Sequence, residues 1–488
     1  MNILTRFQGT LEKKLKEHLG DYIYNTVSAF NNPYDIDSYK QFAEAFDQFT
    51  ANFTIQAYEE FILALDEEFM QSNTRKQLYG SKGYLTKPLL TKFGWINFKR
   101  RKYIRNDNGK SFMFIDRLLG LEKYSRLDPF VITDLCEEAA STSYANAGRL
   151  VSKTIGNKIK YNDDINKNIL SRATARNIVL KASKIIKEPD NEEIKEIAQL
   201  NLLLDEKYVP SQFNDGKDHM IKAAVIYESY KKEYKGRIRL AGKKVFGTTD
   251  GNILPIIMDY IYYHYDTDKL KYINIMGDGA LWIRAIAKDT SLKFHKDIKI
   301  RFGLDHFHLA QAIQIITTNK YKELHGKFIL RYIIQNNKLY FIEVCEILRV
   351  KNLQREDKIK EKMEYILNNW EAIQTSFHQI KWGCCMESNI SHIFADLFTA
   401  RPKAYSKKGL DALLKIRLLK ANGYDFKELY FASLKLLQTE TKEKIISEKH
   451  IIGNIKFNDS LYASVPEMHS SDNNGLSLRN IINSGIKI

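Results

Sequence analysis

The chain has 488 residues, a length that suggests two to four domains rather than one. Hydrophobic residues make up 44% and aromatic residues 12% of it, enough for real cores, which excludes global disorder. The 75 basic and 59 acidic residues give a net charge of +16, which favours a polyanionic partner, with nucleic acid ahead of a membrane surface. A plain basic protein would have the same charge.

Cysteine usage and apolar runs indicate the compartment. Cys136, Cys345, Cys384 and Cys385 form no CxxC pair and no Cys/His zinc spacing, and an adjacent pair forms no ordinary disulfide. The first residues lack the apolar core and cleavage site of a signal peptide. No run of about 18 uncharged apolar residues occurs. We therefore expect a cytoplasmic protein in a reducing environment, with no membrane partner.

The N-terminal 80 residues have an amphipathic helical pattern. Phe42, Phe46, Phe49 and Phe53 follow one another at helical spacing. This pattern suits a packing or oligomerisation module, and nothing in it suggests chemistry.

A β-hairpin is predicted next. Residues 91–105 and 111–114 are rich in β-formers and flank an Asn/Asp/Gly turn at 106–109. The first strand is unusually basic, and we count its cations as candidate DNA contacts: Lys99, Arg100, Arg101 and Lys102. A solvated strand face is the alternative.

Residues from about 115 to 200 return to a helical pattern. Ser171 is a typical helix cap, and Arg172 and Arg176 then lie four residues apart on one helix face. Such a helix resembles the recognition helix of a helix-turn-helix domain, although many solvated helices share the pattern. The two arginines are candidate DNA contacts.

The pattern changes to strands after residue 199. Strands are predicted at 201–204, 221–227, 244–248, 272–276 and 298–304, and each of the last two leads into a helix. Strands first in hairpins and then in β-α units imply a mixed sheet covered by helices, so the fold class is α/β.

The rest of the chain is predicted to be helical. Residues 310–380 have helical periodicity, and another helix begins near Glu387 and ends at Pro402. The predicted domains are a helical module at 1–80, a basic hairpin at 81–116, a helical DNA-binding region at 117–198, a core at 199–317 plus 381–425, a helical insertion at 318–380 and a C-terminal tail at 426–488.

Three acids in this layout can carry chemistry together. Asp205 follows an apolar strand, Asp278 lies in a Gly-Asp-Gly turn after another, and Glu387 lies near a helix start. Cleavage of a phosphodiester by two divalent metals needs oxygen ligands, and carboxylates suit Mg²⁺. The glycines beside Asp278 let phosphate and metal approach the backbone. Each acid alone is more typical of a turn, a strand end or a helix N-terminus.

The chain resembles a known family in several short segments. It is similar to the Lre-type bacterial insertion-sequence transposases, formerly an uncharacterised family, which are related to Mutator-type DDE transposases. No single segment is specific, but the ordered set is. The matching residues are 91–94 with 99–101, 205–209, 277–283, 304–309, 383–392 and 401–409.

The resemblance implies an RNase H-like catalytic core with a helical insertion between the second and third acids. Their separations, 73 residues from Asp205 to Asp278 and 109 more to Glu387, suit such an insertion. It also implies that these acids are the DDE triad and that they hold two Mg²⁺ or Mn²⁺ ions. The expected reaction is DNA cleavage and strand transfer at transposon ends. The expected partners are double-stranded DNA, as transposon ends and target, and further copies of the chain.

Related enzymes carry Cys or Asp, two residues and then His after the second acid, and Asp305 and His308 fit this form. These two either lie beside the metals or hold the catalytic loop by hydrogen bonds, and we favour the structural role. An ordinary core histidine is the alternative for His306 or His308. Further candidate DNA contacts in the last matching segment are Arg401, Lys403, Lys407 and Lys408.

The chain also departs from the family pattern. It has Leu203-Leu204 before the first acid instead of a Glu-Ala-Asp-type run, and Asn389 where a His is common. A decayed or domesticated copy that only binds DNA therefore stays an alternative, as does an RNase H-like nuclease without strand transfer. A metabolic α/β enzyme is disfavoured because no GxGxxG or GxxxxGK[ST] nucleotide-binding motif is present.

Overall fold

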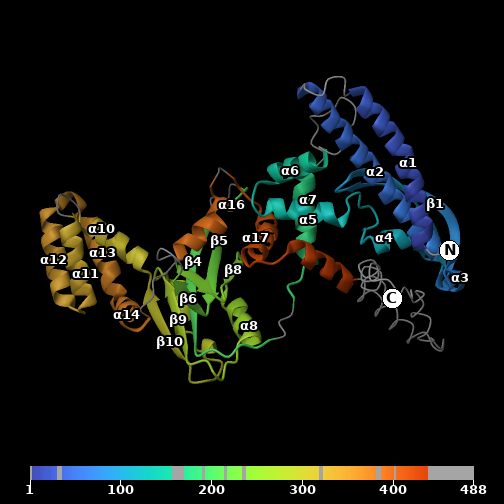
Figure 1. Cartoon of the computed structure of the whole chain (residues 1–488). Helices are drawn as coiled ribbons and strands as arrows, with labels where there is room; N and C mark the ends of the chain where they lie inside the picture. The colour runs from blue at the N-terminus through green and yellow to red at the C-terminus, as the bar shows by residue number, and fades with distance from the viewer. Residues whose placement is uncertain are drawn as a thin grey trace. The chain divides into compact units, whose positions relative to one another are not determined.

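The computed structural model describes residues 3–29, 36–156, 170–189, 193–213, 217–232, 238–317, 322–380, 386–400 and 403–437 (Figure 1). The chain divides into two compact units. The first unit comprises Met1–Lys187 and Asp425–Ile488, and the second is Glu188–Tyr424.

Two long helices begin the first unit, as the N-terminal pattern predicts. Helix α1 (Ile3–Ala29) packs along α2 (Ile36–Gln71). The ring of Tyr22 on α1 contacts Phe46 and Phe49 on α2, with centroids 5.7 and 4.8 Å away. The aromatic spacing seen in the sequence is therefore a helix–helix contact.

A three-stranded sheet follows the short helix α3 (Asn73–Leu78). Its main hairpin pairs β1 (Tyr79–Thr91) with β2 (Gly94–Arg105) around a turn at 92–93. The predicted hairpin around 106–109 exists, but its second strand, β3 (Ser111–Phe112), has only two residues. The prediction missed β1, because its exposed polar residues and glycines lack an alternating pattern.

Four further helices complete the described N-terminal part of this unit. They are α4 (Phe114–Leu118), α5 (Pro129–Ala139), α6 (Tyr144–Gly156) and α7 (Arg172–Ile185). The last three pack against one another. The Oγ of Ser171 accepts a hydrogen bond from the amide of Thr174, which confirms the predicted cap of α7.

The second unit is built on a mixed five-stranded sheet, as the sequence predicts. In spatial order the strands are β10 (Lys299–Leu304), β9 (Tyr272–Gly277), β4 (Gln199–Val209), β5 (His219–Tyr227) and β8 (Lys244–Thr248). Central β4 runs parallel to β9 and antiparallel to β5; β10 is parallel to β9, and β8 is antiparallel to β5. A two-stranded ribbon, β6 (Ser229–Lys232) and β7 (Ile238–Ala241), lies between β5 and β8 in the chain.

Helices cover both faces of this sheet. Side chains of α8 (Leu254–His264) and α9 (Leu281–Lys288) share a core with Leu202 and Leu204 of β4. The opposite face is covered by the π-helix η5 (Ile390–Ala395) and by α17 (Lys407–Ala421). Their side chains Phe394 and Leu414 lie so close to Gly247 of β8 that a Cβ added there would contact both. The buried strands thus have apolar layers on both sides, which explains their nearly continuous hydrophobic sequence.

Between β10 and η5 the chain forms helices with a core of their own. They are α10 (His306–Ile316), α11 (Lys322–Ile334), α12 (Lys338–Lys351), α13 (Glu356–Asn368) and α14 (Trp370–Thr375). Buried side chains from all five helices join in one cluster. Shorter segments are η2 (Thr290–Lys293), η3 (Leu353–Arg355), the π-helix η4 (Ser376–Ile380), α15 (Met386–Asn389) and α16 (Asp396–Phe398).

Two sequence-based expectations can be compared with the fold directly. Within the part of the chain that the structure describes, no helix is both long and apolar enough to cross a membrane. Cys136 and Cys345 are buried and free of disulfides. Cys384 and Cys385 lie outside the described residues.

Candidate active site

The first two acids belong to neighbouring segments of the sheet. In the parallel pairing of β4 with β9, Leu203 is opposite Met276. Asp205 follows two residues later inside β4, where it pairs with Ala223 of β5, and Asp278 follows two residues later in the bend directly after β9. The sequence placed both acids at strand ends. This is confirmed for Asp278, but β4 continues to Val209, so Asp205 lies inside its strand, and the pairing of β4 with β9 makes the two strands neighbours.

The third acid comes from the other side of a long insertion. Glu387 is exposed in the first turn of α15, and this helix contacts β4. The π-helix η5 follows α15 directly and also contacts β4. The chain between the second and third acids holds the helices α9 to α14, so the covering segment returns to the central strand after more than a hundred residues.

The charges of this region act on one another. Burial, together with the negative charges of Asp278 and Glu387, raises the pKa of Asp205 to about 6. A hydrogen bond from the Glu206 amide, 2.7 Å from Oδ1, and the charge of His308 act in the opposite direction. All three proposed catalytic acids and His308 are therefore electrostatic neighbours.

The carboxylates do not form a closed cluster. Across the described side chains, no group of three His, Cys, Asp or Glu residues lies close enough to count as a metal-binding set. Like charges repel, and local bonds orient the two aspartates: Oδ1 of Asp278 accepts from the Ala280 amide at 2.9 Å, as Oδ1 of Asp205 does from Glu206. The three acids thus share one region without converging on one point.

Asp305 and His308 have different environments. Asp305 is 3% exposed and caps α10, accepting a hydrogen bond from the Phe307 amide at 2.9 Å. Its own amide donates to the carbonyl of Gly277, beside the second acid, at 2.8 Å. This geometry favours the structural role for Asp305. His308, in the first turn of the same helix, contributes through its charge beside Asp205.

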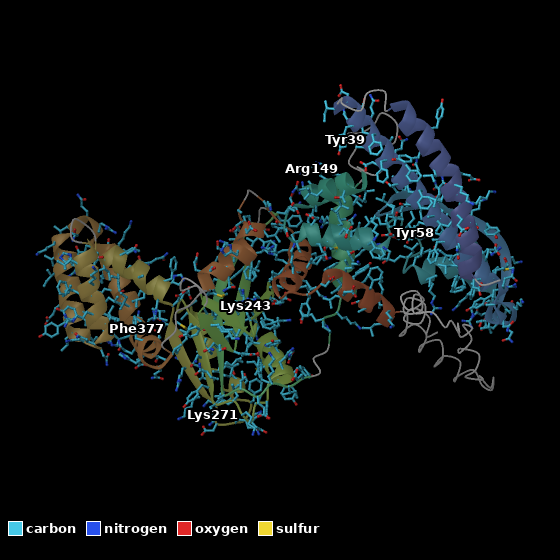
Figure 2. The ribbon with its side chains drawn as sticks, viewed as in Figure 1. Tyr39, Tyr58, Arg149, Lys243, Lys271 and Phe377 are labelled. Carbon is cyan, nitrogen blue, oxygen red and sulfur yellow. The ribbon has the colours of Figure 1, made fainter. Side chains whose placement is uncertain are left out.

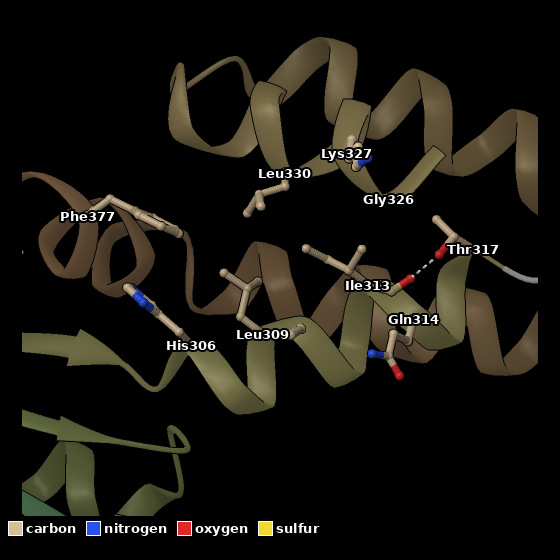
Figure 3. Close-up of a pocket in the computed structure, with 10 residues that line it drawn as sticks. His306, Leu309, Ile313, Gln314, Thr317, Gly326, Lys327, Leu330 and Phe377 are labelled. Carbon is tan, nitrogen blue, oxygen red and sulfur yellow. Dashed lines mark hydrogen bonds between the residues drawn. The ribbon is translucent and has the colours of Figure 1, made fainter. Parts of the chain in front are cut away.

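One cavity lies between α10 and α11 (Figure 3). It has a volume of about 670 Å³ and is mainly apolar, with Leu309, Ile313 and Leu330 on its walls. His306 and Phe377 stack at one end, with ring centroids 4.4 Å apart, and burial lowers the pKa of His306. His306 thus matches the expected alternative of a packed core histidine, and the three candidate acids are not among the lining residues.

The basic hairpin is less available to DNA than its sequence suggests. Arg100 forms an ion pair with Asp116, and Arg101 is buried, with its guanidinium close to Asp66 and Glu67. Lys99 is exposed and Lys102 is half-buried. Two of the four predicted DNA contacts therefore form ion pairs within the first unit. A run of basic residues in the sequence cannot reveal such partners.

The two arginines of α7 are both exposed. Arg172 and Arg176 lie in its first turns, and buried Ala175 and Val179 lie on the adjoining part of the helix surface. Arg149 on the neighbouring helix α6 is also exposed, and its guanidinium contacts the side chain of Asn146 at 2.8 Å (Figure 2).

The basic residues of the last segment, 401–409, differ in their exposure and in their partners. Lys407 and Lys408 are exposed at the start of α17, and Lys407 forms an ion pair with Asp250 at 2.8 Å. Lys403 donates to the carbonyl of Leu397 at 2.9 Å. Arg401 lies outside the described residues.

Sequence reasoning missed the partners of the acidic residues. The Nε1 of Trp282 and, at 3.2 Å, the hydroxyl of Tyr208 donate to the carboxylate of Glu206, the residue after the first acid. Tyr365 on α13 donates to the carbonyl of Asp278 at 2.7 Å. The Gly-Asp-Gly-Ala-Leu-Trp segment marked Trp282 as part of the motif, but no local signal singles out Tyr365, 87 residues after Asp278.

Comparisons with known proteins identify relatives over most of the chain. The sequence model of the uncharacterised protein family UPF0236 matches residues 38–433. A relative from Caldanaerobacter subterraneus subsp. tengcongensis, UPF0236 protein TTE2489, is 28% identical over 80% of this chain and 82% of its own length. Another from that organism, 28% identical over 80% of this chain and 81% of its own length, has a name that joins eleven TTE designations. A UPF0236 protein of Streptococcus gallolyticus, named for the vanSb 3′ region, is 26% identical over 58% of this chain and 60% of its own length.

Proposed function

The chain belongs to the UPF0236 family, and we propose that it is a DDE-type transposase that cuts and joins DNA with Asp205, Asp278 and Glu387. The observation that carries the proposal is the parallel pairing of β4 with β9, which makes the strand of the first acid and the strand before the second acid neighbours, so that the charge of Asp278 acts on Asp205. The helix of the third acid packs against the same central strand. An acid on a central strand, one on its neighbour and one on a covering helix form the arrangement expected of an RNase H-like core.

The donor set fits Mg²⁺ or Mn²⁺. All three proposed ligands are carboxylates, which suit hard divalent cations and leave room for water and substrate phosphate. Two such ions held there would supply Lewis acidity and a template for in-line attack on a phosphodiester bond. Gly279, with φ of +87°, keeps the backbone beside Asp278 free of a Cβ.

The acidic residues also explain why the site would need a cation. Burial and the neighbouring acids make ionised Asp205 costly, and a bound cation would remove that cost. The positive charge of His308 partly balances the negative charge of Asp205. After cleavage, the freed 3′ hydroxyl would attack target DNA in the same site, so no covalent protein intermediate is required.

Exposed cations would hold the DNA. The proposed contacts begin with Arg172 and Arg176 on α7, followed by exposed Lys99 and Lys408. Contacts of this kind bind phosphates and set the salt dependence without reading sequence. The chain would act on chromosomal DNA in a bacterial cytoplasm, and pairing two transposon ends would require at least two copies.

The name of one relative supports a mobile element. It joins eleven designations within one organism. A single protein under many designations in one genome is what an element that copies itself would leave behind. An ordinary metabolic enzyme has no need of such repetition.

The test uses purified full-length protein and a duplex that carries the ends of the DNA element encoding it. Wild-type protein with Mg²⁺ is expected to cleave at the ends and to join a pre-cut end to target DNA. Asp205→Asn, Asp278→Asn and Glu387→Gln should each reduce both activities by at least about a thousandfold, because the ligands act as one set. Asp259→Asn, an exposed acid on α8, is the matched control and should keep both activities.

The alternatives give different results in the same experiment. Cleavage without joining would indicate a nuclease of the same fold class. Wild-type protein no more active than Asp278→Asn, with equal DNA binding, would indicate an inactive copy that only binds DNA. Full activity in all three acid variants would overturn the proposed site.

A further inference from the structure

The loop of the second acid is held by three separate parts of the chain. Its three consecutive carbonyls belong to Gly277, Asp278 and Gly279. They accept hydrogen bonds from the amide of Asp305 at 2.8 Å, the hydroxyl of Tyr365 at 2.7 Å and the Nε of Arg284 at 2.8 Å. These donors come from the cap of α10, from α13 and from α9. Every carbonyl of the Gly-Asp-Gly turn is thus fixed from outside the turn.

Asn369 links two of these donors. Its Oδ1 accepts from Nη2 of Arg284 at 2.8 Å, and its Nδ2 donates to the carbonyl of Tyr365 at 2.8 Å. Asn369 is 3% exposed and follows α13 directly. Arg284, Tyr365 and Asn369, here called the loop brace, therefore form one connected set of hydrogen bonds.

The fit between brace and loop is close. A Cβ on Gly279 would lie 2.5 Å from Oδ1 of Asn369, far inside contact distance. The φ of +87° at Gly279 is also one that other residues rarely adopt. The loop can therefore adopt this conformation only with glycine at 279, and the brace fills the space that a side chain would need.

Holding the carbonyls fixes the direction of the carboxylate. Oδ1 of Asp278 accepts from the Ala280 amide two residues later, so the side chain follows the loop backbone. A change in the loop backbone would move the carboxylate with it. Since hydrogen bonds are specific in geometry, three of them restrict the loop more than packing alone.

We propose that Tyr365, Arg284 and Asn369 are positioning residues, by which the helical insertion orients Asp278 for the metal. This inference rests on the proposed function. Two of the three residues, Tyr365 on α13 and Asn369 directly after it, lie in the helical insertion at 318–380, so the insertion would be part of the catalytic machinery as well as a separate core.

The experiment compares Tyr365→Phe with Tyr332→Phe in the full-length protein. Tyr365→Phe removes only the hydroxyl that holds the Asp278 carbonyl, whereas Tyr332 lies half-buried on α11 and stacks on Tyr340, so it is the matched control. Mn²⁺ binding is measured by titration calorimetry, and DNA cleavage is measured as a function of Mn²⁺ concentration. Loss of one hydrogen bond of typical strength should weaken metal binding about threefold to tenfold in Tyr365→Phe. Tyr332→Phe should match wild type.

The readouts separate positioning from folding. The melting temperature of Tyr365→Phe should stay within about 5 °C of wild type, and excess Mn²⁺ should restore much of its cleavage rate. If its melting temperature falls further, Arg284→Lys is measured in the same way. This substitution keeps the positive charge but loses the guanidinium geometry that bonds the Gly279 carbonyl and Asn369 together. Wild-type metal affinity in the folded variant overturns the inference. Wild-type metal affinity in Asp278→Asn would instead overturn the proposed function on which it rests.

Discussion

Removing the charge of Asp205 is expected to stabilise the metal-free protein while it abolishes activity. Burial and the neighbouring acids raise the pKa of Asp205 from 3.8 to about 6. Each pKa unit corresponds to about 1.36 kcal/mol, so the ionised form costs the folded state up to about 3 kcal/mol. Asp205→Asn removes this cost and keeps an oxygen that can accept from the Glu206 amide.

The sign of the pH dependence follows from the direction of the shift. A carboxyl whose pKa is raised by folding contributes stability below its unfolded pKa of 3.8, and this contribution is lost as the pH rises through about 6. Compared with wild type, Asp205→Asn should therefore gain about 1–3 kcal/mol at pH 7.5. At pH 4 the gain should fall below about 1 kcal/mol.

The assay is urea unfolding in the presence of a chelator, at pH 4 and 7.5, followed by tryptophan fluorescence, to which Trp282 and Trp370 of the second unit contribute. Repeating it with about 10 mM Mg²⁺ should reverse the order of stability, because only the wild-type protein would gain from metal binding. An Asp205→Asn variant that is less stable than wild type at pH 7.5 without metal would refute the reasoning. So would a gain that is equal at both pH values.

Three further predictions concern other parts of the chain. Arg172→Glu combined with Arg176→Glu should weaken DNA binding and lower the slope of log affinity against log salt by about 1.8, since each phosphate contact contributes about 0.9. Arg101→Met should destabilise the first unit by about 3–5 kcal/mol in urea unfolding, because it leaves the fully buried carboxylate of Asp66 without its cation. Gly279→Ala should lower the cleavage rate more than tenfold and the stability by about 1–3 kcal/mol, owing to its positive φ and the contact with the loop brace.

Each of these has a control and a contrary result. Lys358→Glu with Lys360→Glu changes the same charge at exposed positions of α13 and should leave the salt slope within experimental error of wild type. Lys99→Ala, at an exposed position next to the buried arginines, should change stability by less than about 0.5 kcal/mol. An unchanged slope in the α7 variant, an Arg101→Met protein as stable as wild type, or a fully active Gly279→Ala would each contradict the corresponding argument.

Much of the second unit could be predicted because its signals are local. The strands of the sheet are short apolar runs bounded by turns, and Asp205 and Asp278 follow two of them. Which strands are neighbours is not local, so the pairing of β4 with β9, which brings these two acids into one region, needed the structure. The position of Glu387 is less local still, because it depends on a chain segment that returns after the inserted helices.

The features that the sequence did not predict were missed for equally physical reasons. Strand β1 presents six consecutive exposed positions, so it has no alternating pattern to recognise. Arg100 and Arg101 look like a DNA-binding pair until their acidic partners Asp66 and Asp116, on other elements, are known. The loop brace joins residues about 85 positions apart through hydrogen bonds, and hydrogen bonds leave no periodic trace in a sequence.

The π-helix η5 has a consequence for insertions and deletions in this part of the chain. It lies between α15, which carries Glu387, and α16, and so interrupts the α-helical geometry. A π turn accommodates one residue more than an α turn, and each α-helical residue rotates the helix by about 100°. Deleting a single residue from 390–395 would let the segment close into a regular α-helix and turn Glu387 away from β4, while Phe394 and Leu397 kept their places in the core. One residue in this segment would thereby decide whether Glu387 can reach the proposed site, without a change in any acid.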